Sequence, residues 1–202
     1  MATITQIQTH AQNYVKGNSN LLSAEEIRIA QTINNLVTTY HPWRWSIVAG
    51  TNVTTASGTQ EYNLDAADQN RVHKLNEAWL VSAGTALFPL IIYDWIAVPT
   101  IGTTGQPYGI SLITEARVHL YPTPGAVYTL SHRFHTSGTV FTANTESYDA
   151  PARFDETIKE GVIWKFLEFL DDGRAPDKQK SFYDLLNHQK RIDMRKQHEV
   201  RS

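Results

Sequence analysis

The stretch His41-Pro42-Trp43-Arg44-Trp45 separates two kinds of sequence. Before it, apolar residues recur every three or four positions, as they do on one face of a helix. A helix has to end here, because Pro42 lacks a backbone N–H and disfavours helical geometry at the residue before it. After Trp45 the chain is rich in Thr, Val, Ile and Gly, which is typical of strands and turns. The stretch therefore marks a change from helix to sheet.

The helical pattern returns at Asp149-Ala150-Pro151, where Asp can cap a helix and Pro fits its first turn. The two borders predict an α+β protein. A small α-helical bundle of about four helices, drawn from both termini, is formed by residues 1–44 and 149–202. Residues 45–148 form an inserted antiparallel β-domain, either a sandwich or barrel-like.

The joint between the two parts should contain four residues from the two borders, namely Trp43, Arg44, Trp45 and Phe154. We expect one of the tryptophans to pack between bundle and β-domain near Phe154, because large rings fill such junctions. Arg44 should point outward or toward a carboxylate such as Asp155. The stretch is thus interpreted as a rigid coupling and not as a ligand site.

The helices of the bundle are marked by caps and stripes. We expect a helix over residues 3–16 and a second one that begins at a capping box, Ser23 with Glu26, and runs to about Tyr40. A third helix carries an unbroken apolar stripe with a spacing of four residues: Phe154, Ile158, Val162, Phe166 and Leu170. The last helix follows Pro176, and its apolar face thins out, so the final dozen or so residues should extend beyond the body. Trp164 lies just off the stripe of the third helix and is a candidate for a subunit contact.

Strands are expected at residues 60–64, 72–82, 86–92, 117–121 and 127–134. The last two flank Pro122-Thr123-Pro124-Gly125 and predict a hairpin. In the expected register, Leu120 faces Tyr128 and Val118 faces Leu130, so that the apolar residues share one side. The same register sets Glu115 opposite Arg133.

Composition argues against several classes of protein. The 202 residues include no cysteine, which removes disulfides and thiolate chemistry. The N-terminal residues do not resemble a signal peptide, and no apolar run approaches the length of a membrane span. Eight histidines occur without the spacing of a metal site, and no nucleophile elbow or phosphate loop is present. We therefore expect no enzyme activity, no cofactor, no metal and no membrane association.

A carbohydrate-binding or glycan-cleaving β-sandwich is an alternative. Tyr93, Trp79 and Trp95 could stack on sugar rings, and Glu77 or Asp94 could supply a carboxylate. Such aromatic residues are more often part of a core or an interface.

The end of the chain is basic, although the formal net charge is −2. A basic end favours an acidic partner or nucleic acid, and it also suits a solvated helix end, where cations meet the negative pole of the helix dipole.

The order of these elements is similar to that of the head-to-tail adaptor (connector) proteins of tailed bacteriophages, the class that includes tail tubular protein A. The resemblance covers roughly residues 36–170. Beyond the Trp-Arg-Trp joint it rests on short motifs: residues 58–64 (Gly-Thr-Gln-Glu-Tyr-Asn-Leu), the loop Gly105-Gln106-Pro107-Tyr108, and residues 118–124 (Val-His-Leu-Tyr-Pro-Thr-Pro). Leu64-Asp65 stands where the family pattern leads us to expect Leu-Pro.

The resemblance implies a structural protein of the virion neck that is assembled in the host cytoplasm. Identical subunits, typically about twelve, would form a homo-oligomeric ring that joins the portal protein to a downstream tail protein. DNA would pass through the lumen without sequence-specific binding. The C-terminal tail would grip the portal, and in this chain its candidate residues are Lys190, Arg191, Met194, Arg195, Lys196, Val200 and Arg201.

Overall fold

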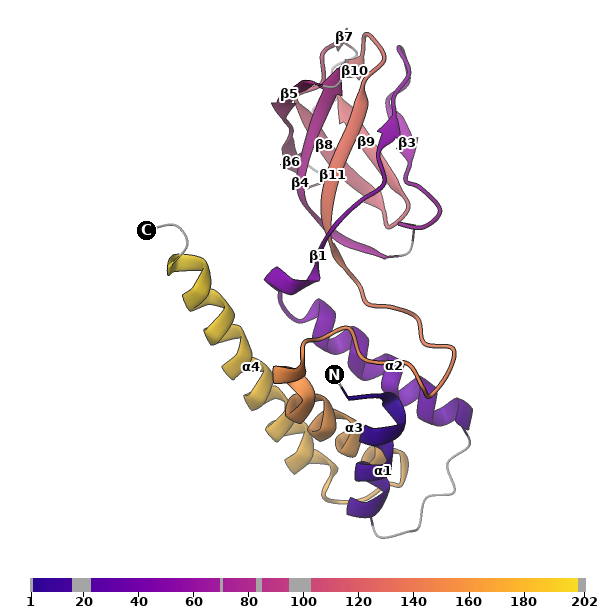
Figure 1. Cartoon of the computed structure of the whole chain (residues 1–202), viewed down its shortest axis with the longest axis vertical. Coiled ribbons are helices and arrows are strands. Elements are labelled where there is room, and N and C mark those ends of the chain that lie inside the picture. The colour runs from indigo at the N-terminus through magenta and orange to yellow at the C-terminus, as the bar shows by residue number, and fades with distance from the viewer. Residues whose placement is uncertain (1, 16–22, 70, 83–84, 95–102, 200–202) are drawn as a thin grey trace. The chain divides into compact units, whose positions relative to one another are not determined.

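The computed structural model contains two units (Figure 1). The helical unit comprises residues 1–45 and 138–202, and the β unit comprises residues 46–137. The fold is α+β. The second border lies before the expected residue 149, because Phe141 and Tyr148 are buried in the core of the helical unit. The structure describes residues 2–15, 23–69, 71–82, 85–94 and 103–199.

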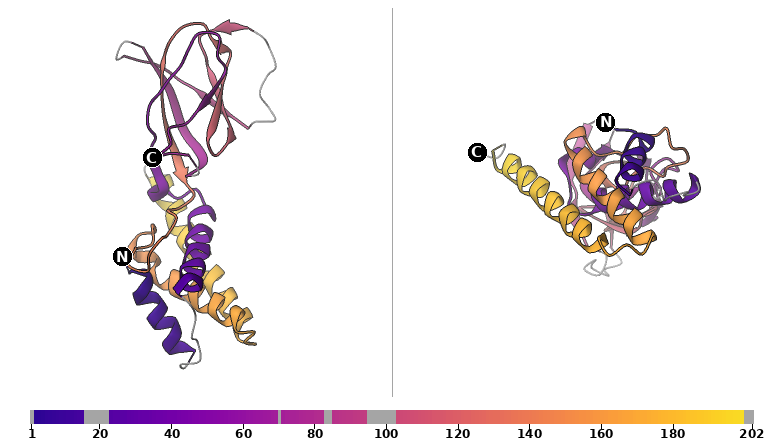
Figure 2. Two further views of the ribbon diagram at one scale, coloured as in Figure 1. Left: turned by 90° about the vertical axis from the view of Figure 1, so that its right-hand side faces the viewer. Right: turned by 90° about the horizontal axis from the view of Figure 1, so that it is seen from below.

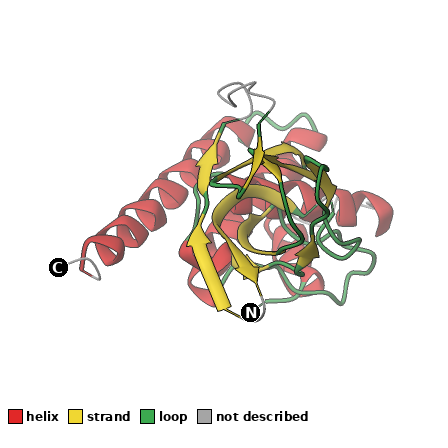
Figure 3. Ribbon diagram, turned by 90° about the horizontal axis from the view of Figure 1, so that it is seen from above, coloured by secondary structure: helices red, strands yellow, loops and turns green. Residues whose placement is uncertain are grey.

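Within those residues the helical unit holds four α-helices: α1 (Ile4–Tyr14), α2 (Ser23–Thr39), α3 (Asp155–Phe169) and α4 (Ala175–Glu199). Two short 3-10 turns, η1 (Arg44–Ser46) and η3 (Ala152–Phe154), follow α2 and precede α3. Helix α3 packs against each of the other three helices. Figures 2 and 3 show that α4 reaches well past the other helices toward the C-terminus.

The core of the helical unit follows the predicted stripes. From Phe154 to Phe166, every fourth residue is at most 1% exposed, and Ala30, Ile33 and Val37 of α2 are fully buried beside them. The structure confirms the predicted helices. An apolar stripe with this period lies on one face of the chain when the backbone is helical, which is why the sequence could predict them.

Helix α1 begins with a capping box formed by Thr3 and Gln6, in which each side chain accepts from the other residue's backbone N–H. The predicted box of α2 stays a prediction, because the flank before Ser23 lies outside the described residues. The carboxylate of Glu26 accepts from the side chains of Gln12 and Asn144.

Asp149 also has a different role from the expected one, since η3 has no side-chain cap. Its Oδ2 accepts from the Asn34 amide and from the backbone N–H of Thr139, both at 2.7 Å. These bonds fix the segment after residue 138 along α2. Its carboxylate therefore serves this connection and does not cap a helix.

The β unit contains eleven strands in the described residues. They are β1 (Ile47–Ala49), β2 (Val53–Thr54), β3 (Glu61–Asn63), β4 (Val72–Ser82), β5 (Thr85–Pro89), β6 (Ile91–Tyr93), β7 (Thr104–Gly105), β8 (Gly109–Thr114), β9 (Arg117–Tyr121), β10 (Thr123–Pro124) and β11 (Thr129–Thr136). One sheet has the order β1-β11-β4-β5, with β2 also on β11, and another has the order β3-β9-β8-β6. Strands β7 and β10 form a small separate pair.

The two larger sheets enclose one apolar core, as a sandwich does. The first sheet contributes Leu80, Leu130 and Phe134, and the second contributes Val118 and Leu120. The expected antiparallel pairing holds throughout the first sheet. In the second sheet β6 pairs with β8 in parallel, and the small separate pair of β7 and β10 is also parallel. The described strands do not close into a barrel.

The predicted hairpin between residues 117–121 and 127–134 is wrong. Strand β9 pairs with β3 and β8, whereas β11 pairs with β1, β2 and β4, so the two strands belong to different sheets. Arg133 consequently lies opposite Glu77, at 3.3 Å between their charged atoms, and not opposite Glu115. The residues between the strands cross from one sheet to the other and do not form a tight turn.

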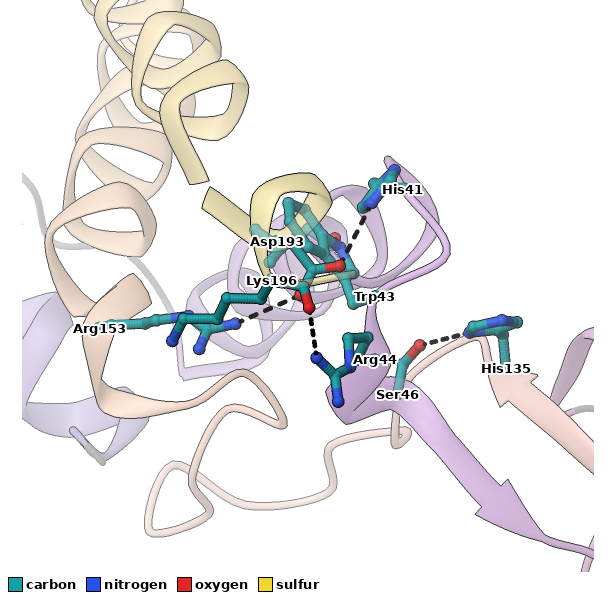
Figure 4. Close-up of polar contacts among 9 residues, drawn as sticks. His41, Trp43, Arg44, Ser46, His135, Arg153, Asp193 and Lys196 are labelled. Atoms are coloured by element: carbon teal, nitrogen blue, oxygen red, sulfur yellow. Dashed lines mark hydrogen bonds and ion pairs between the residues drawn. The ribbon is translucent and has the colours of Figure 1, made fainter. Parts of the chain in front are cut away.

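The ends of the β unit are next to each other. Strand β1 runs antiparallel to the end of β11, with Ile47 in register with His135. The Oγ of Ser46 lies 2.9 Å from Nδ1 of His135 (Figure 4). The insertion thus begins and ends at one place in the sheet.

Candidate interaction surface

Helix α4 is held to the helical unit first by apolar packing. Phe182 and Leu186 are fully buried against the core. Phe182 fits because Gly161 of α3 has no side chain: a Cβ there would lie 2.8 Å from the phenyl ring. Beyond Leu186, the described part of α4 contributes no further residue to the buried apolar core.

Beyond Leu186, the charged side chain of Asp193 attaches α4 to the rest of the helical unit. It is only 2% exposed, and its carboxylate lies 3.4 Å from Nε2 of His41 and 3.8 Å from a guanidinium nitrogen of Arg153 (Figure 4). A carboxylate is buried at this depth only where donors or cations compensate for the lost water. The end of α4 therefore stays attached to the helical unit as far as Asp193, although α4 reaches past the other helices, so the expectation that the last dozen or so residues extend beyond the body is met only in part.

His41 meets Asp193 in a partly buried position. Burial lowers the pKa of the His41 ring and Lys190 acts in the same direction, while Asp193 acts in the opposite one. Because the net shift is downward, the ring is mainly neutral at pH 7. Because the His41 ring is mainly neutral, the positive charge beside the Asp193 carboxylate in this pair of contacts comes from Arg153.

Arg44 fixes the end of the helix in a second way. Its guanidinium donates to the carbonyl oxygen of Lys196 at 3.3 Å (Figure 4). The last four carbonyls of a helix lack partners within it, and a cation near them also suits the helix dipole. Arg44 is exposed, in agreement with the first of the two expected orientations, and its partner is this carbonyl and not the carboxylate of Asp155 that was the alternative.

The tryptophans beside Arg44 belong to the core of the helical unit. Trp43 is fully buried, its indole N–H donates to the carbonyl of Val37 at 2.6 Å, and its ring meets Phe154 edge-on at 5.0 Å. Trp45 is half-buried, with its ring centre 5.7 Å from that of Phe154. Segment 41–45 is thereby fixed on η3 and α4.

The outer side of the α4 end carries positive charge. Arg191, Arg195 and Lys196 are exposed, Lys190 is half-buried, and Met194 is 43% exposed among them. Since Asp193 points inward, the only acid between residues 185 and 196 is removed from this surface. The name basic end of α4 is used below for six cations. Four of them lie on α4 and two, from η1 and η3, lie beside it: Lys190, Arg191, Arg195, Lys196, Arg44 and Arg153. Val200 and Arg201, which the sequence had added, lie outside the described residues.

Other candidates from the sequence lie elsewhere. Trp164 is only 4% exposed and packs on Phe182 and Tyr183 with ring centres 5.6 and 5.9 Å apart, which leaves little of the ring for a neighbouring subunit. Trp79 is half-buried with Arg133 over its ring, and Trp95 lies outside the described residues.

Sequence reasoning missed Asp193, although one signal was present. Asp193 follows Leu186 by seven positions, which places it on the same face of a helix as the buried leucine. A charged residue on an apolar face indicates either the end of the buried part or a buried ion pair. The partners His41 and Arg153 come from distant parts of the chain and give no such signal.

Two searches of the described residues bear on other kinds of site. They contain no cluster of three or more His, Cys, Asp or Glu side chains that could hold a metal ion. Nor do they include a helix with the length and apolar character that crossing a membrane requires.

Comparison with known proteins places the chain in a family. No curated protein matches it. The family model described as SU10 adaptor protein matches residues 2–201, which is nearly the whole chain and includes both units. The match agrees with the resemblance to phage head-to-tail adaptors that the order of elements indicates. The chain belongs to the SU10 adaptor protein family.

Proposed function

We propose that this protein is a structural head-to-tail adaptor of a phage virion. Identical copies form a ring of about twelve, which joins the portal protein to a tail protein and lets DNA pass without sequence-specific contact. The observation that carries the proposal is the family match over residues 2–201. The protein acts in the neck of the virion, after assembly in the host cytoplasm, and has no catalytic role.

Two features of the helical unit support a docking role. The basic end of α4 is exposed, and its backbone is fixed by Asp193 and by the bond from Arg44 to the carbonyl of Lys196. A surface that is ordered before binding loses less conformational entropy on docking. In the proposal, this end and the residues after it bind the portal.

The segment Trp43-Arg44-Trp45 has a second role in the proposal. It is fixed in the helical unit and lies at the border with the β unit in the sequence. We assign it, with Phe154, as the coupling between the part that docks on the portal and the part that meets the tail.

The test mixes the purified full-length chain with the portal protein encoded by the same phage and images the particles by electron microscopy. We expect an additional ring of density on one end of the portal. A portal that keeps its own outline at micromolar adaptor concentrations would contradict the proposal. A deletion of residues 190–202 is a poor probe, because it also removes Asp193 from His41 and Arg153.

A further inference from the structure

We propose that the basic end of α4 docks on a protein surface that is rich in carboxylates. The inference rests on the proposed function, in which that protein is the portal, and it specifies the chemistry of the receiving surface. It also names Arg191, Met194 and Arg195 as the contact residues.

The first step is the charge of this surface. From the sequence, the region from Lys190 to Lys196 has four cations and one acid. The structure turns that acid inward, since Asp193 is 2% exposed and lies beside Arg153 and His41. What faces outward is therefore positive without a neighbouring carboxylate among the described residues of this stretch, and it attracts a negative partner.

The second step is the state of the outward arginines. Arg191 and Arg195 are exposed and four residues apart, so their side chains leave the same face of α4, one turn from each other. Neither forms an ion pair within the described part of the chain, whereas Lys178, another cation of α4, binds Glu160. Two guanidinium groups at this spacing can each bind a carboxylate with two parallel hydrogen bonds.

The third step distinguishes a protein from nucleic acid. Protein interfaces are enriched in Arg and Met, whereas phosphate contacts use Lys as readily as Arg. Met194 lies between the two arginines in sequence and is 43% exposed, although it is a large apolar side chain. An apolar side chain surrounded by cations gains little from a phosphate backbone, but it can be buried against a protein.

The test measures binding of the full-length chain to the immobilised portal protein at about 50, 150 and 500 mM NaCl. We expect the dissociation constant to rise about tenfold or more over this range, because electrostatic attraction is screened by salt. The double variant R191E/R195E should bind about tenfold or more weakly at 150 mM, and Met194→Ala should weaken binding at every salt concentration.

The matched control is K74E/K180E, which makes the same change in net charge at two exposed lysines away from the α4 end. It should bind as the wild type does. Unchanged thermal unfolding of R191E/R195E would show that the variant is folded, as expected for two exposed side chains.

The outcomes separate the inference from the function. If the wild type binds the portal but R191E/R195E binds equally well, or salt has no effect, the carboxylate surface is refuted and the adaptor function stands. If the wild type does not bind the portal at any salt concentration, the adaptor function fails as well. If R191E/R195E abolishes binding to a fluorescent DNA duplex but not to the portal, the basic end is a nucleic-acid surface and the inference is wrong.

Discussion

Asp193 shows how one residue can decide where a helix end lies. Among the described residues, Leu186 is the last residue of α4 in the buried apolar core, and apolar packing alone would leave the helix beyond it free to fray. The buried carboxylate of Asp193, facing Arg153 and His41, continues the attachment.

The variant Asp193→Asn tests this role. It removes the charge but keeps the volume, so that Arg153 and His41 lose the negative charge that lies beside them. We expect the helical unit to lose about 1–2 kcal/mol of stability, measured by urea unfolding. The control is Asp184→Asn, since Asp184 is exposed on the same helix. Equal stability of both variants would exclude an anchoring role for Asp193.

His132 is a second residue with a large effect, in this case on the β unit. It is 2% exposed, and neither ring nitrogen has a hydrogen-bond partner among the described residues. Burial lowers the pKa of the ring, and the nearby carboxylate of Asp68 opposes this only in part. A buried ring without partners is stable only in its neutral form.

The pH dependence of stability follows from this shift. In the unfolded chain the His132 ring has a pKa of about 6.5, so below that pH the unfolded state binds a proton that the folded state does not. Stability of the β unit should therefore be full above about pH 6.5 and should fall as the pH decreases toward the lower pKa of the folded state. Urea unfolding at several pH values, followed by NMR signals of the β unit, measures this slope.

His132→Gln should flatten the slope, even though it lowers stability at neutral pH. His119 also has a pKa that burial lowers, against an opposing effect of Glu61, so part of the slope should remain. His188→Gln, at an exposed site on α4, should leave the slope unchanged. A slope that is the same in His132→Gln and in the wild type would refute the assignment to His132.

At the scale of elements, the contact between α3 and α4 depends on a glycine. A Cβ at position 161 would lie 2.8 Å from the ring of Phe182 and 3.0 Å from Cδ1 of Ile33, both of which are fully buried. Gly161→Ala should therefore cost about 1–3 kcal/mol, because the two helices must move apart or the ring must leave its position. Thermal unfolding of the full chain gives the measurement.

The control for this substitution is in the connection between the same helices. A Cβ at Gly173 would meet no atom within 4 Å, so Gly173→Ala should be close to neutral. If both alanine variants unfold at the wild-type temperature, the close approach of α3 and α4 is not a constraint.

The strands β9 and β11 show where prediction at this scale failed. Val118 and Leu120 alternate with the period of a strand, as do Leu130 and Phe134, and all four are buried. That alternation brings the apolar residues together equally well if the strands lie side by side or face each other across a sandwich. The strands are in different sheets, so the period fixed the buried face but not the pairing partner.

For the whole molecule, the β unit should fold when it is separated from the rest. It has its own apolar core, and its first strand pairs with its last, with Ile47 opposite His135. Cutting the chain at residues 46 and 137 therefore leaves both ends beside each other. We expect a fragment of residues 46–137 to give a dispersed amide NMR spectrum. A narrow, collapsed spectrum would mean that the helical unit is needed for folding.

The sequence by itself determined the helices and their buried faces, whereas strand β8 was not among the predicted strands. The proline after His41 and the four-residue stripe from Phe154 fixed the helix borders, because backbone chemistry and helical period act locally. The order of those elements was also enough to indicate the adaptor family, which the match over residues 2–201 confirmed.

Only the tertiary structure decided which distant residues meet. The partners of Asp193 are 152 and 40 positions away in the chain, at His41 and Arg153, and no local rule relates them. The same holds for the pairing of β11 with β4 and for the inward turn of the one acid in the basic end of α4. Burial and charge compensation depend on how the whole chain packs, which a period along the sequence does not specify.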